Sequence, residues 1–218
     1  MKTNSHGNEP FSERPLLVFW EMTKACHLAC FHCRADAQRV GGPDELSTNE
    51  GFALIDSLAR IGSPRPILIL TGGDCLMRDD IVELAAYAEK AGLPLAIAPS
   101  VTPRFTPTVL RTLRAHGVTS ASLSLDGATS STHDAVRGID GHFASTIEAL
   151  GELKELDFTT QVNTTVMPTN VGELADVAAL VHDLHVDVWE VFFLITTGRG
   201  SALRATSSTQ NAGTGRAS

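Results

Sequence analysis

The stretch Cys26-His27-Leu28-Ala29-Cys30-Phe31-His32-Cys33 places three thiols in one short loop that follows an apolar segment. Core packing does not explain such a group of cysteines. Thiolates are soft ligands that bind zinc or iron–sulfur clusters, and the spacing C-x3-C-x2-C lets one loop wrap three irons of a 4Fe–4S cluster. Three protein ligands leave the fourth iron without a sulfur from the chain, so that iron can hold an outside molecule.

Two other uses of the thiols are open. A structural zinc site takes four ligands, and the fourth could come from His27, His32 or Cys75. Disulfide bonds are the second alternative. An odd group of three close thiols, with an N-terminus that lacks the apolar stretch of a signal peptide, favours a reducing compartment over disulfides.

Composition limits the classes of protein to consider. The chain has 218 residues, of which 43% are hydrophobic, and this length suits one domain with a substantial core. Its formal net charge is −8 and its positive residues are scattered, so the basic stripe of a nucleic-acid-binding protein is missing. No apolar run approaches the roughly 20 residues that cross a bilayer. We therefore expect a cytoplasmic protein without a nucleic-acid or membrane partner.

Between a polar, flexible leader over residues 1–14 and a disordered, low-complexity tail over 201–218, we expect one core domain over 15–200. Apolar strand-like segments alternate there with amphipathic helices, which implies right-handed crossovers and a parallel sheet. The hydrophobic pattern alone does not distinguish a barrel from a doubly wound sheet. The strands are expected over residues 16–20, 67–70, 95–98, 121–125, 160–164 and 188–195.

Helix signals separate these strands. We expect helices over residues 50–61, 79–91, 107–116 and 143–156, and a last helix that is capped at Asn170 to Glu173 and ends near Leu184. Ser47 and Glu50 have the spacing of a capping box. A long loop is expected around Arg137. The first strand, an unbroken apolar run, is expected to be covered on both faces.

Further motifs follow the strands: Trp20-Glu21-Met22-Thr23 leads into the cysteine loop, Thr71-Gly72-Gly73-Asp74 follows the second strand, and Ser122-Leu123-Ser124-Leu125-Asp126-Gly127 ends the fourth. Together with the cysteine spacing, these motifs resemble the radical S-adenosylmethionine (SAM) superfamily. Within it, the chain looks like the branch of haem-modifying and peptide- or cofactor-maturing members that usually carry a C-terminal cysteine-rich SPASM domain.

The resemblance implies an α/β fold, a partial (β/α)6 TIM-like barrel of parallel strands with its site at their C-terminal ends. It also implies two cofactors, one 4Fe–4S cluster and SAM. The reduced cluster would cleave SAM to a 5'-deoxyadenosyl radical that takes hydrogen from an unidentified small-molecule or peptide substrate, such as a cofactor or haem precursor. Such an oxidoreductase or maturase needs an electron donor, for example flavodoxin or ferredoxin.

By the same resemblance, Cys26, Cys30 and Cys33 would hold three irons, and the backbone of His32 would lie near the adenine. Gly72 and Gly73 would let the ligand approach the strand end closely, and Asp74 would accept a hydrogen bond from the methionine ammonium. On its own, the sequence Gly-Gly-Asp is typical of an ordinary turn.

Four later residues complete the implied SAM site. Ser124 and Asp126 resemble the ribose and methionine contacts of the family, and Arg137 has the charge and fork geometry to meet the methionine carboxylate. Its alternative is a solvated loop arginine. Asn163 is a further candidate for ribose or carboxylate binding. Leu194 and Ile195 either pack on adenine or belong to the core.

Cys75 stands where the family more often has proline, and it is either a chance substitution or a thiol near the radical. Five histidines show no metal-ligand spacing and are interpreted as surface or capping residues: His116, His133, His142, His182 and His185.

No cysteine follows Cys75, so the cysteine-rich domain of the resembling branch is missing from this sequence. The chain is then either a minimal enzyme whose open side is covered by substrate or by a partner chain, or a truncated relic, which the tail composition favours. The alternative function is a non-catalytic iron–sulfur or zinc-binding protein.

Overall fold

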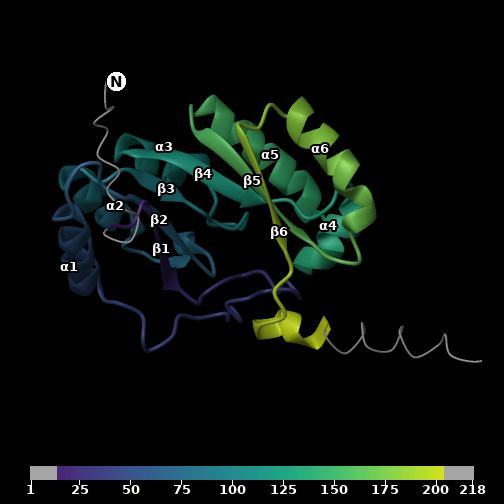
Figure 1. The fold of residues 1–218 in the computed structure, drawn as a ribbon, viewed down its shortest axis with the longest axis horizontal. Helices are drawn as coiled ribbons and strands as arrows, with labels where there is room; N and C mark the ends of the chain where they lie inside the picture. The colour runs from purple at the N-terminus through teal and green to yellow at the C-terminus, as the bar shows by residue number, and fades with distance from the viewer. Residues whose placement is uncertain (1–13, 204–218) are drawn as a thin grey trace, which may run out of the picture.

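In the computed structural model, residues 14–203 are described (Figure 1). Residues 1–13 of the expected leader and residues 204–218 of the expected tail lie outside the described residues. The 3-10 helix η3 (Gly198–Leu203) carries the chain past residue 200, where we expected the core to end. Within the described part of the chain, no helix combines the length and the apolar character that a bilayer crossing requires.

Six parallel strands form one sheet in the order β1-β2-β3-β4-β5-β6, so every strand pairs with its neighbour in sequence. This order confirms the expected partial barrel: right-handed crossovers wind the sheet in one direction, and β1 and β6 stand at its two edges. The strands are β1 (Leu17–Thr23), β2 (Ile67–Gly72), β3 (Leu95–Ile97), β4 (Val118–Ser124), β5 (Thr159–Val166) and β6 (Val188–Phe193).

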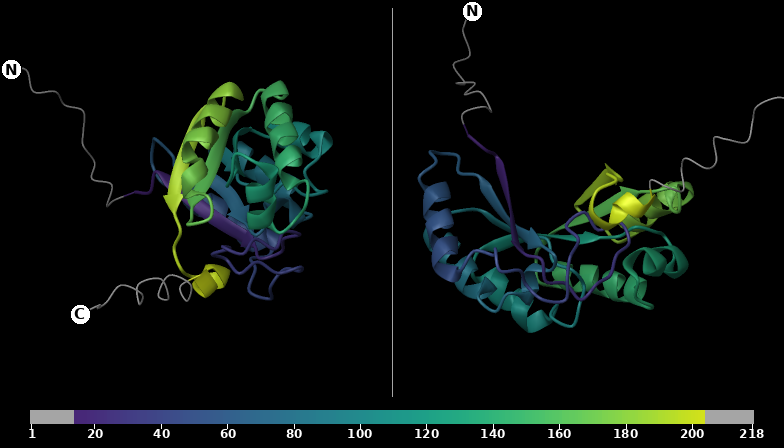
Figure 2. Two further views of the ribbon diagram at one scale, coloured as in Figure 1. Left: turned by 90° about the vertical axis from the view of Figure 1, so that its right-hand side faces the viewer. Right: turned by 90° about the horizontal axis from the view of Figure 1, so that it is seen from below.

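The helices cover the convex face of this curved sheet, and Figure 2 shows the concave face open on the other side. They are α1 (Thr48–Ala59), α2 (Ile81–Lys90), α3 (Pro107–Ala115), α4 (Ser130–Arg137), α5 (His142–Glu155) and α6 (Leu174–Asp183), with the 3-10 helices η1 (Cys75–Met77) and η2 (Val171–Glu173) between them.

The hydrophobic core lies between the sheet and the helices, and alternate strand residues are almost completely buried there, among them Leu68, Leu70, Leu95, Ile97 and Leu123. The expectation that both faces of β1 are covered is wrong. Trp20 is 7% exposed on the helix side, whereas Phe19 beside it is 63% exposed. Side chains alternate between the faces of a strand, and β1 is an edge strand of a barrel that does not close.

Helix ends follow their sequence signals. Ser47 and Glu50 form the expected capping box at α1, and the Thr106 side chain accepts a hydrogen bond from the backbone of Val109, with Pro107 as the first residue of α3. Gly92, with φ +76°, follows α2. Such local signals are short-range, which is why they can be seen in the sequence.

The expectation of a long loop around Arg137 is wrong, because residues 130–137 form α4. Thr129 caps this helix by accepting a hydrogen bond from the Thr132 N–H, and Gly138, with φ +72°, ends it. The buried face of α4 includes His133 and Arg137. A helix whose buried face carries ionisable side chains lacks the apolar periodicity from which helices are predicted.

Candidate functional site

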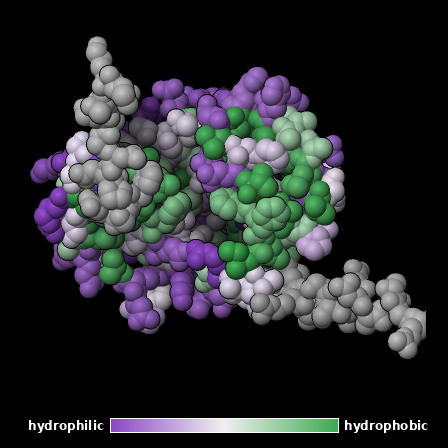
Figure 3. Space-filling model, viewed as in Figure 1, coloured by the Kyte–Doolittle hydropathy of each residue, from purple (hydrophilic) through white to green (hydrophobic). Residues whose placement is uncertain are grey.

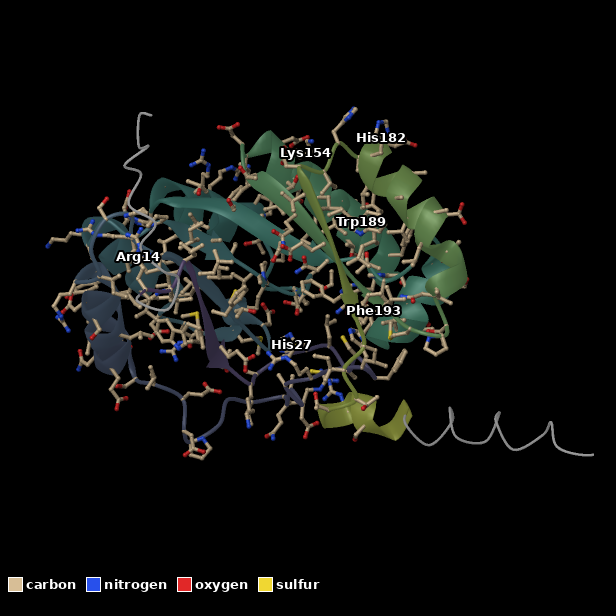
Figure 4. The ribbon with its side chains drawn as sticks, viewed as in Figure 1. Arg14, His27, Lys154, His182, Trp189 and Phe193 are labelled. Atoms are coloured by element: carbon tan, nitrogen blue, oxygen red, sulfur yellow. The ribbon has the colours of Figure 1, made fainter. Side chains whose placement is uncertain are left out.

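A cavity of about 390 Å³ lies at the C-terminal ends of the strands, where parallel α/β folds place their sites. The cysteine loop and the ends of β2, β4, β5 and β6 surround it. In Figure 4, His27 of that loop lies on the same side of the molecule as Phe193 at the end of β6. The expected site residues that line the cavity are Cys26, Cys30, His32, Cys33, Gly72, Gly73, Ser124, Arg137 and Asn163.

The three loop cysteines are free thiols, and the sulfur of each accepts an N–H hydrogen bond. Backbone N–H groups of the loop donate to the Sγ atoms of Cys26 and Cys33 at 3.4 and 3.5 Å, and Arg137 Nη1 lies 3.6 Å from Cys30 Sγ. Burial raises the pKa of the Cys26 thiol. Donors of this kind orient ligand thiolates and tune iron–sulfur clusters, so the donor set fits a cluster with three cysteine ligands.

Cys75 does not belong to this group. Its side chain is fully buried in η1 within the main hydrophobic core, and burial raises the pKa of its thiol. Cys26 and Cys30 lie in a separate apolar cluster under the loop. Cys75 is also absent from the wall of the cavity that the three loop cysteines line, so the structure does not place it as a fourth ligand of a zinc site there. Among the described residues, no three His, Cys, Asp or Glu side chains lie close enough to hold a single metal ion.

Gly72 and Gly73 border the cavity, and both pack closely on neighbouring backbone. Gly72 has φ +130°, and a Cβ atom there would lie 2.4 Å from the carbonyl oxygen of Thr23. A Cβ at Gly73 would lie 2.4 Å from the Ala25 carbonyl oxygen. The glycines therefore let the end of β2 pack directly on the backbone that enters the cysteine loop, rather than only leaving space for a ligand.

The Asp74 carboxylate, which was expected to bind the methionine ammonium, has partners within the protein. Asp74 is completely buried and does not line the cavity. Its oxygens accept hydrogen bonds from Thr102 Oγ1 at 2.8 Å, from the Leu76 N–H at 3.1 Å and from the Ser100 N–H at 3.3 Å. With these three donors, the carboxylate holds the loop after β3 against the end of β2.

Asp126 is likewise buried and absent from the cavity wall, where we expected a direct SAM contact. Its Oδ2 lies 2.5 Å from Arg137 Nη2 and its Oδ1 accepts the Thr165 N–H at 2.8 Å. Asp126 therefore positions Arg137. The alternative of a solvated loop arginine is wrong, because Arg137 is 8% exposed. Burial disfavours its charge, but Asp126 and Cys30 outweigh that effect and raise the pKa of Arg137.

Two buried nitrogen atoms at the cavity are without a hydrogen-bond partner among the described residues. They are Nε of Arg137 and Nδ1 of His32, and His32 Nε2 lies 3.8 Å from Asp126 Oδ2. A buried polar atom without a partner costs free energy. These atoms are therefore open to a polar ligand, which is consistent with a nucleoside or amino-acid group in the cavity.

The capping role expected of Asn170 is wrong, because its side chain makes no helix-cap bond. Its Nδ2 group donates to the carbonyl oxygens of Asp126 and Thr165 at 2.9 and 2.8 Å, and its Oδ1 accepts the Met167 N–H at 2.7 Å. Asn170 thus ties the end of β4 to the end of β5. Both strands carry cavity residues.

His133 and His142 are buried, so their interpretation as surface or capping residues is wrong. His133 Nδ1 accepts the Asp126 N–H at 3.1 Å, and therefore its Nε2 carries the proton and donates to His142 Nδ1 at 2.9 Å. His142 Nε2 then donates to the Val101 carbonyl oxygen at 3.1 Å. The backbone bonds at both ends fix one neutral tautomer for each ring. The sequence carried no signal for this pair, which forms only when α4 packs on α5.

The buried histidines predict acid sensitivity of the fold. Burial, with the nearby Arg137 charge, lowers the pKa of His133 from 6.5 to about 3. The unfolded chain takes up a proton below pH 6.5 that the folded chain refuses until about pH 3. Stability is therefore lost as pH falls through this window, and His133 alone should contribute a loss of about 1.4 kcal/mol between pH 7.5 and 5.5.

Urea unfolding at the two pH values measures this loss. His133→Asn should be less stable than the wild type at both pH values, but its loss of stability between them should be smaller by about 1.4 kcal/mol. His182→Asn is the matched control, because the His182 side chain is 84% exposed at the surface of α6. A pH dependence that is the same in His133→Asn and the wild type would refute the assignment.

The two sides of the cavity differ in polarity. Ser122, Ser124 and Asn163 supply hydroxyl and amide groups from β4 and β5, and Asn163 Oδ1 accepts a hydrogen bond from Gln161 Nε2 at 2.8 Å. The other side, formed by the neighbouring strand β6 and the residues after it, is apolar and consists of Phe192, Phe193, Leu194 and Ile195. Hydrophobic side chains gather on this face in Figure 3. Ile195 is 65% exposed, so it borders the open mouth and does not belong to the core.

The partial barrel of parallel strands brings three free thiols, a buried arginine and a glycine-lined strand end together around one cavity. The chain belongs to the radical SAM superfamily, whose sequence model matches residues 20–181. Members of this family use a 4Fe–4S cluster and SAM, which are the two cofactors that we expected.

Two relatives carry the same name. The chain is 40% identical over 187 residues to an AdoMet-dependent heme synthase of Nitratidesulfovibrio vulgaris, and this match covers 86% of the chain and 50% of the relative. It is 42% identical over 186 residues to an AdoMet-dependent heme synthase of Methanosarcina barkeri, with 85% of the chain and 52% of the relative covered. The chain thus spans about half the length of these relatives.

Among solved structures, Streptococcus suis SuiB bound to the precursor peptide SuiA aligns with a TM-score of 0.72. The sequence identity is 15%, and the alignment covers 90% of this chain and 47% of SuiB. At this identity the likeness shows the fold alone. It confirms the TIM-like partial barrel of six strands.

Proposed function

We propose that this chain is the catalytic core of a radical SAM oxidoreductase or maturase that holds one 4Fe–4S cluster at Cys26, Cys30 and Cys33. The observation that carries the proposal is the convergence of these thiols, Arg137 and the Gly72–Gly73 strand end on one cavity. When bound, the reduced cluster supplies the electron that splits SAM into methionine and a 5'-deoxyadenosyl radical, which abstracts hydrogen from the substrate.

The residues around the cavity would then bind and orient SAM. Arg137 presents its guanidinium toward the cavity because Asp126 holds it from behind, and it is the candidate partner of the methionine carboxylate. Ser124 and Asn163 offer a hydroxyl and an amide to the ribose. The buried Nδ1 of His32 is free to meet a polar group of the nucleoside. Asp74 and Asp126 would act through the residues they hold.

For the substrate we propose a haem precursor. The two relatives named AdoMet-dependent heme synthase support this class, as does the apolar wall of Phe192, Phe193, Leu194 and Ile195, which suits a large flat macrocycle better than a polar peptide backbone. A one-electron donor such as flavodoxin or ferredoxin, in the cytoplasm, would complete the reaction. A competition experiment tests the substrate class. A porphyrin, but not unrelated peptides, should compete in the reaction that forms 5'-deoxyadenosine.

Anaerobic reconstitution tests the cluster and its catalytic role. We expect about four irons per chain, as one 4Fe–4S cluster requires, and a low-temperature EPR spectrum of the reduced protein that changes when SAM is added. The rival, a non-catalytic iron–sulfur or zinc protein, gives a spectrum that SAM leaves unchanged, or zinc in place of iron. About eight irons per chain would contradict the single cluster.

A further inference from the structure

The segment that follows β6 returns to the cysteine loop, and Figures 1 and 2 show η3 beside it. The Arg199 side chain donates from Nε to the Cys30 carbonyl oxygen at 2.9 Å and from Nη1 to the Ala37 carbonyl oxygen at 2.7 Å. The backbone N–H of Arg199 donates to the Cys33 carbonyl oxygen at 3.0 Å. One residue from the far end of the described chain therefore contacts the backbone of two of the three cysteines.

Gly198 makes this contact possible. It has φ +54°, and a Cβ atom at this position would lie 2.5 Å from the carbonyl oxygens of both Cys33 and Arg34. Any side chain would push η3 away from the loop, because those atoms are backbone and cannot move aside. The backbone geometry and the side-chain bonds of residues 198 and 199 thus serve the same contact.

Apart from Arg199, the middle of the loop is held by long hydrogen bonds and by the exposed ion pair of Arg34 with Glu21. Two backbone hydrogen bonds fix the ends of the loop. The Cys26 N–H donates to the Gln38 carbonyl oxygen at 2.7 Å, and the Gln38 N–H donates to the Lys24 carbonyl oxygen at 2.8 Å. Between them, the backbone bonds from Phe31 to Val136 and from Cys33 to Cys30 are 3.4 and 3.3 Å long, near the limit of a hydrogen bond. Arg199 supplies the short bonds that this middle part lacks.

We propose that Arg199 is a positioning residue that holds the cysteine loop in the shape that accepts the cluster. This inference rests on the proposed function. By fixing the Cys30 and Cys33 backbones, Arg199 limits the positions that their sulfur atoms can take. It also links the loop to the segment that follows β6, the strand at the open edge of the barrel.

Arginine is required in this role because two separate carbonyl oxygens are bound by two differently directed N–H groups of one rigid fork. A lysine carries the same charge, but its single ammonium on a flexible stem does not reproduce that geometry. The charge of residue 199 is secondary: Asp36, the neighbouring carboxylate, lies 3.8 Å from Nη1 and is exposed.

Hydrogen exchange of the cluster-free protein tests the contact without any loaded enzyme. In Arg199→Ala and Arg199→Lys, we expect the amides of residues 30–38 to exchange about tenfold faster than in the wild type, while amides of α1 and α2 keep their rates. Arg39→Ala is the matched control. Arg39 is an exposed arginine of the same loop with one bond, from Nη1 to the His27 carbonyl oxygen at 3.1 Å, and its loss should leave residues 30–38 unchanged.

In reconstituted protein, both Arg199 variants should lose iron to a chelator about tenfold faster than the wild type and Arg39→Ala, and the EPR spectrum of the reduced cluster should change. Unchanged exchange of residues 30–38 in Arg199→Lys overturns the proposal, as does full rescue of cluster lifetime by lysine. If Arg199→Ala does not fold, Arg199→Lys still decides. A wild type that takes up no iron refutes the proposed function instead, while the exchange experiment continues to test the contact.

Discussion

Replacing Cys30 with alanine is expected to abolish iron–sulfur cluster binding, whereas replacing Cys75 with alanine should leave it intact. Cys30 is one of three thiols on the cavity, and two remaining ligands do not retain a 4Fe–4S cluster against exchange. Cys75 lies in the core behind the strand end. Iron and sulfide analysis after anaerobic reconstitution should give less than about one iron per chain for Cys30→Ala and about four for Cys75→Ala.

The two variants control for each other because each removes one buried thiol. Circular dichroism and urea unfolding of the cluster-free proteins should show that both fold, with a loss of about 1 kcal/mol for Cys75→Ala from the small cavity that it leaves. Equal loss of iron in the two variants would place Cys75 among the ligands and contradict the site. Full iron content in Cys30→Ala would contradict it as well.

The positions of the strands along the chain could be predicted because the signals are local. Buried parallel strands such as Ile67–Gly72 are short apolar runs, and caps such as Ser47 with Glu50 lie within one helical turn. The order of the six strands came from the family resemblance, because right-handed crossovers occur in barrels and in doubly wound sheets alike. Closure does not follow from such signals, and the exposed Phe19 of β1 shows that an apolar strand can stand at an open edge.

The cavity residues could be predicted where the motif lies in one short stretch or at a strand end. The three cysteines, Ser124 and Asn163 are examples. Contacts between distant segments left no pattern in the sequence. Arg199 reaches Cys30 from 169 residues away, and the His133–His142 pair depends on the packing of two helices.

The carboxylates show a different limit. Asp74 and Asp126 follow strands at the positions where site residues are expected, but both side chains turn into the protein and bind donors there. A sequence places a residue at a strand end without saying which way its side chain points. Both side chains are buried away from the cavity wall in this structure, and their contact with SAM stays a prediction.

Asp126→Asn should be among the most damaging single substitutions in this protein. The Arg137 guanidinium is buried and pairs with Asp126 Oδ2 at 2.5 Å, so that loss of the carboxylate charge leaves an uncompensated buried cation. Breaking a buried ion pair in this way costs about 3–5 kcal/mol. The freed guanidinium would also lose its direction toward the cavity. Urea unfolding should show the loss of stability, and the EPR response of the reconstituted variant to SAM should disappear.

A second ion pair provides the control. Arg78 Nη2 and Asp80 Oδ2 lie 2.6 Å apart on the loop before α2, with side chains that are 10% and 17% exposed, and neither residue lines the SAM cavity. Asp80→Asn should reduce stability by less, because water reaches this pair, and should keep the SAM response. The double variant Asp126→Asn with Arg137→Gln removes both charges and should regain part of the stability but none of the SAM response. If Asp126→Asn alone responds to SAM like the wild type, Asp126 does not position Arg137 for the cofactor.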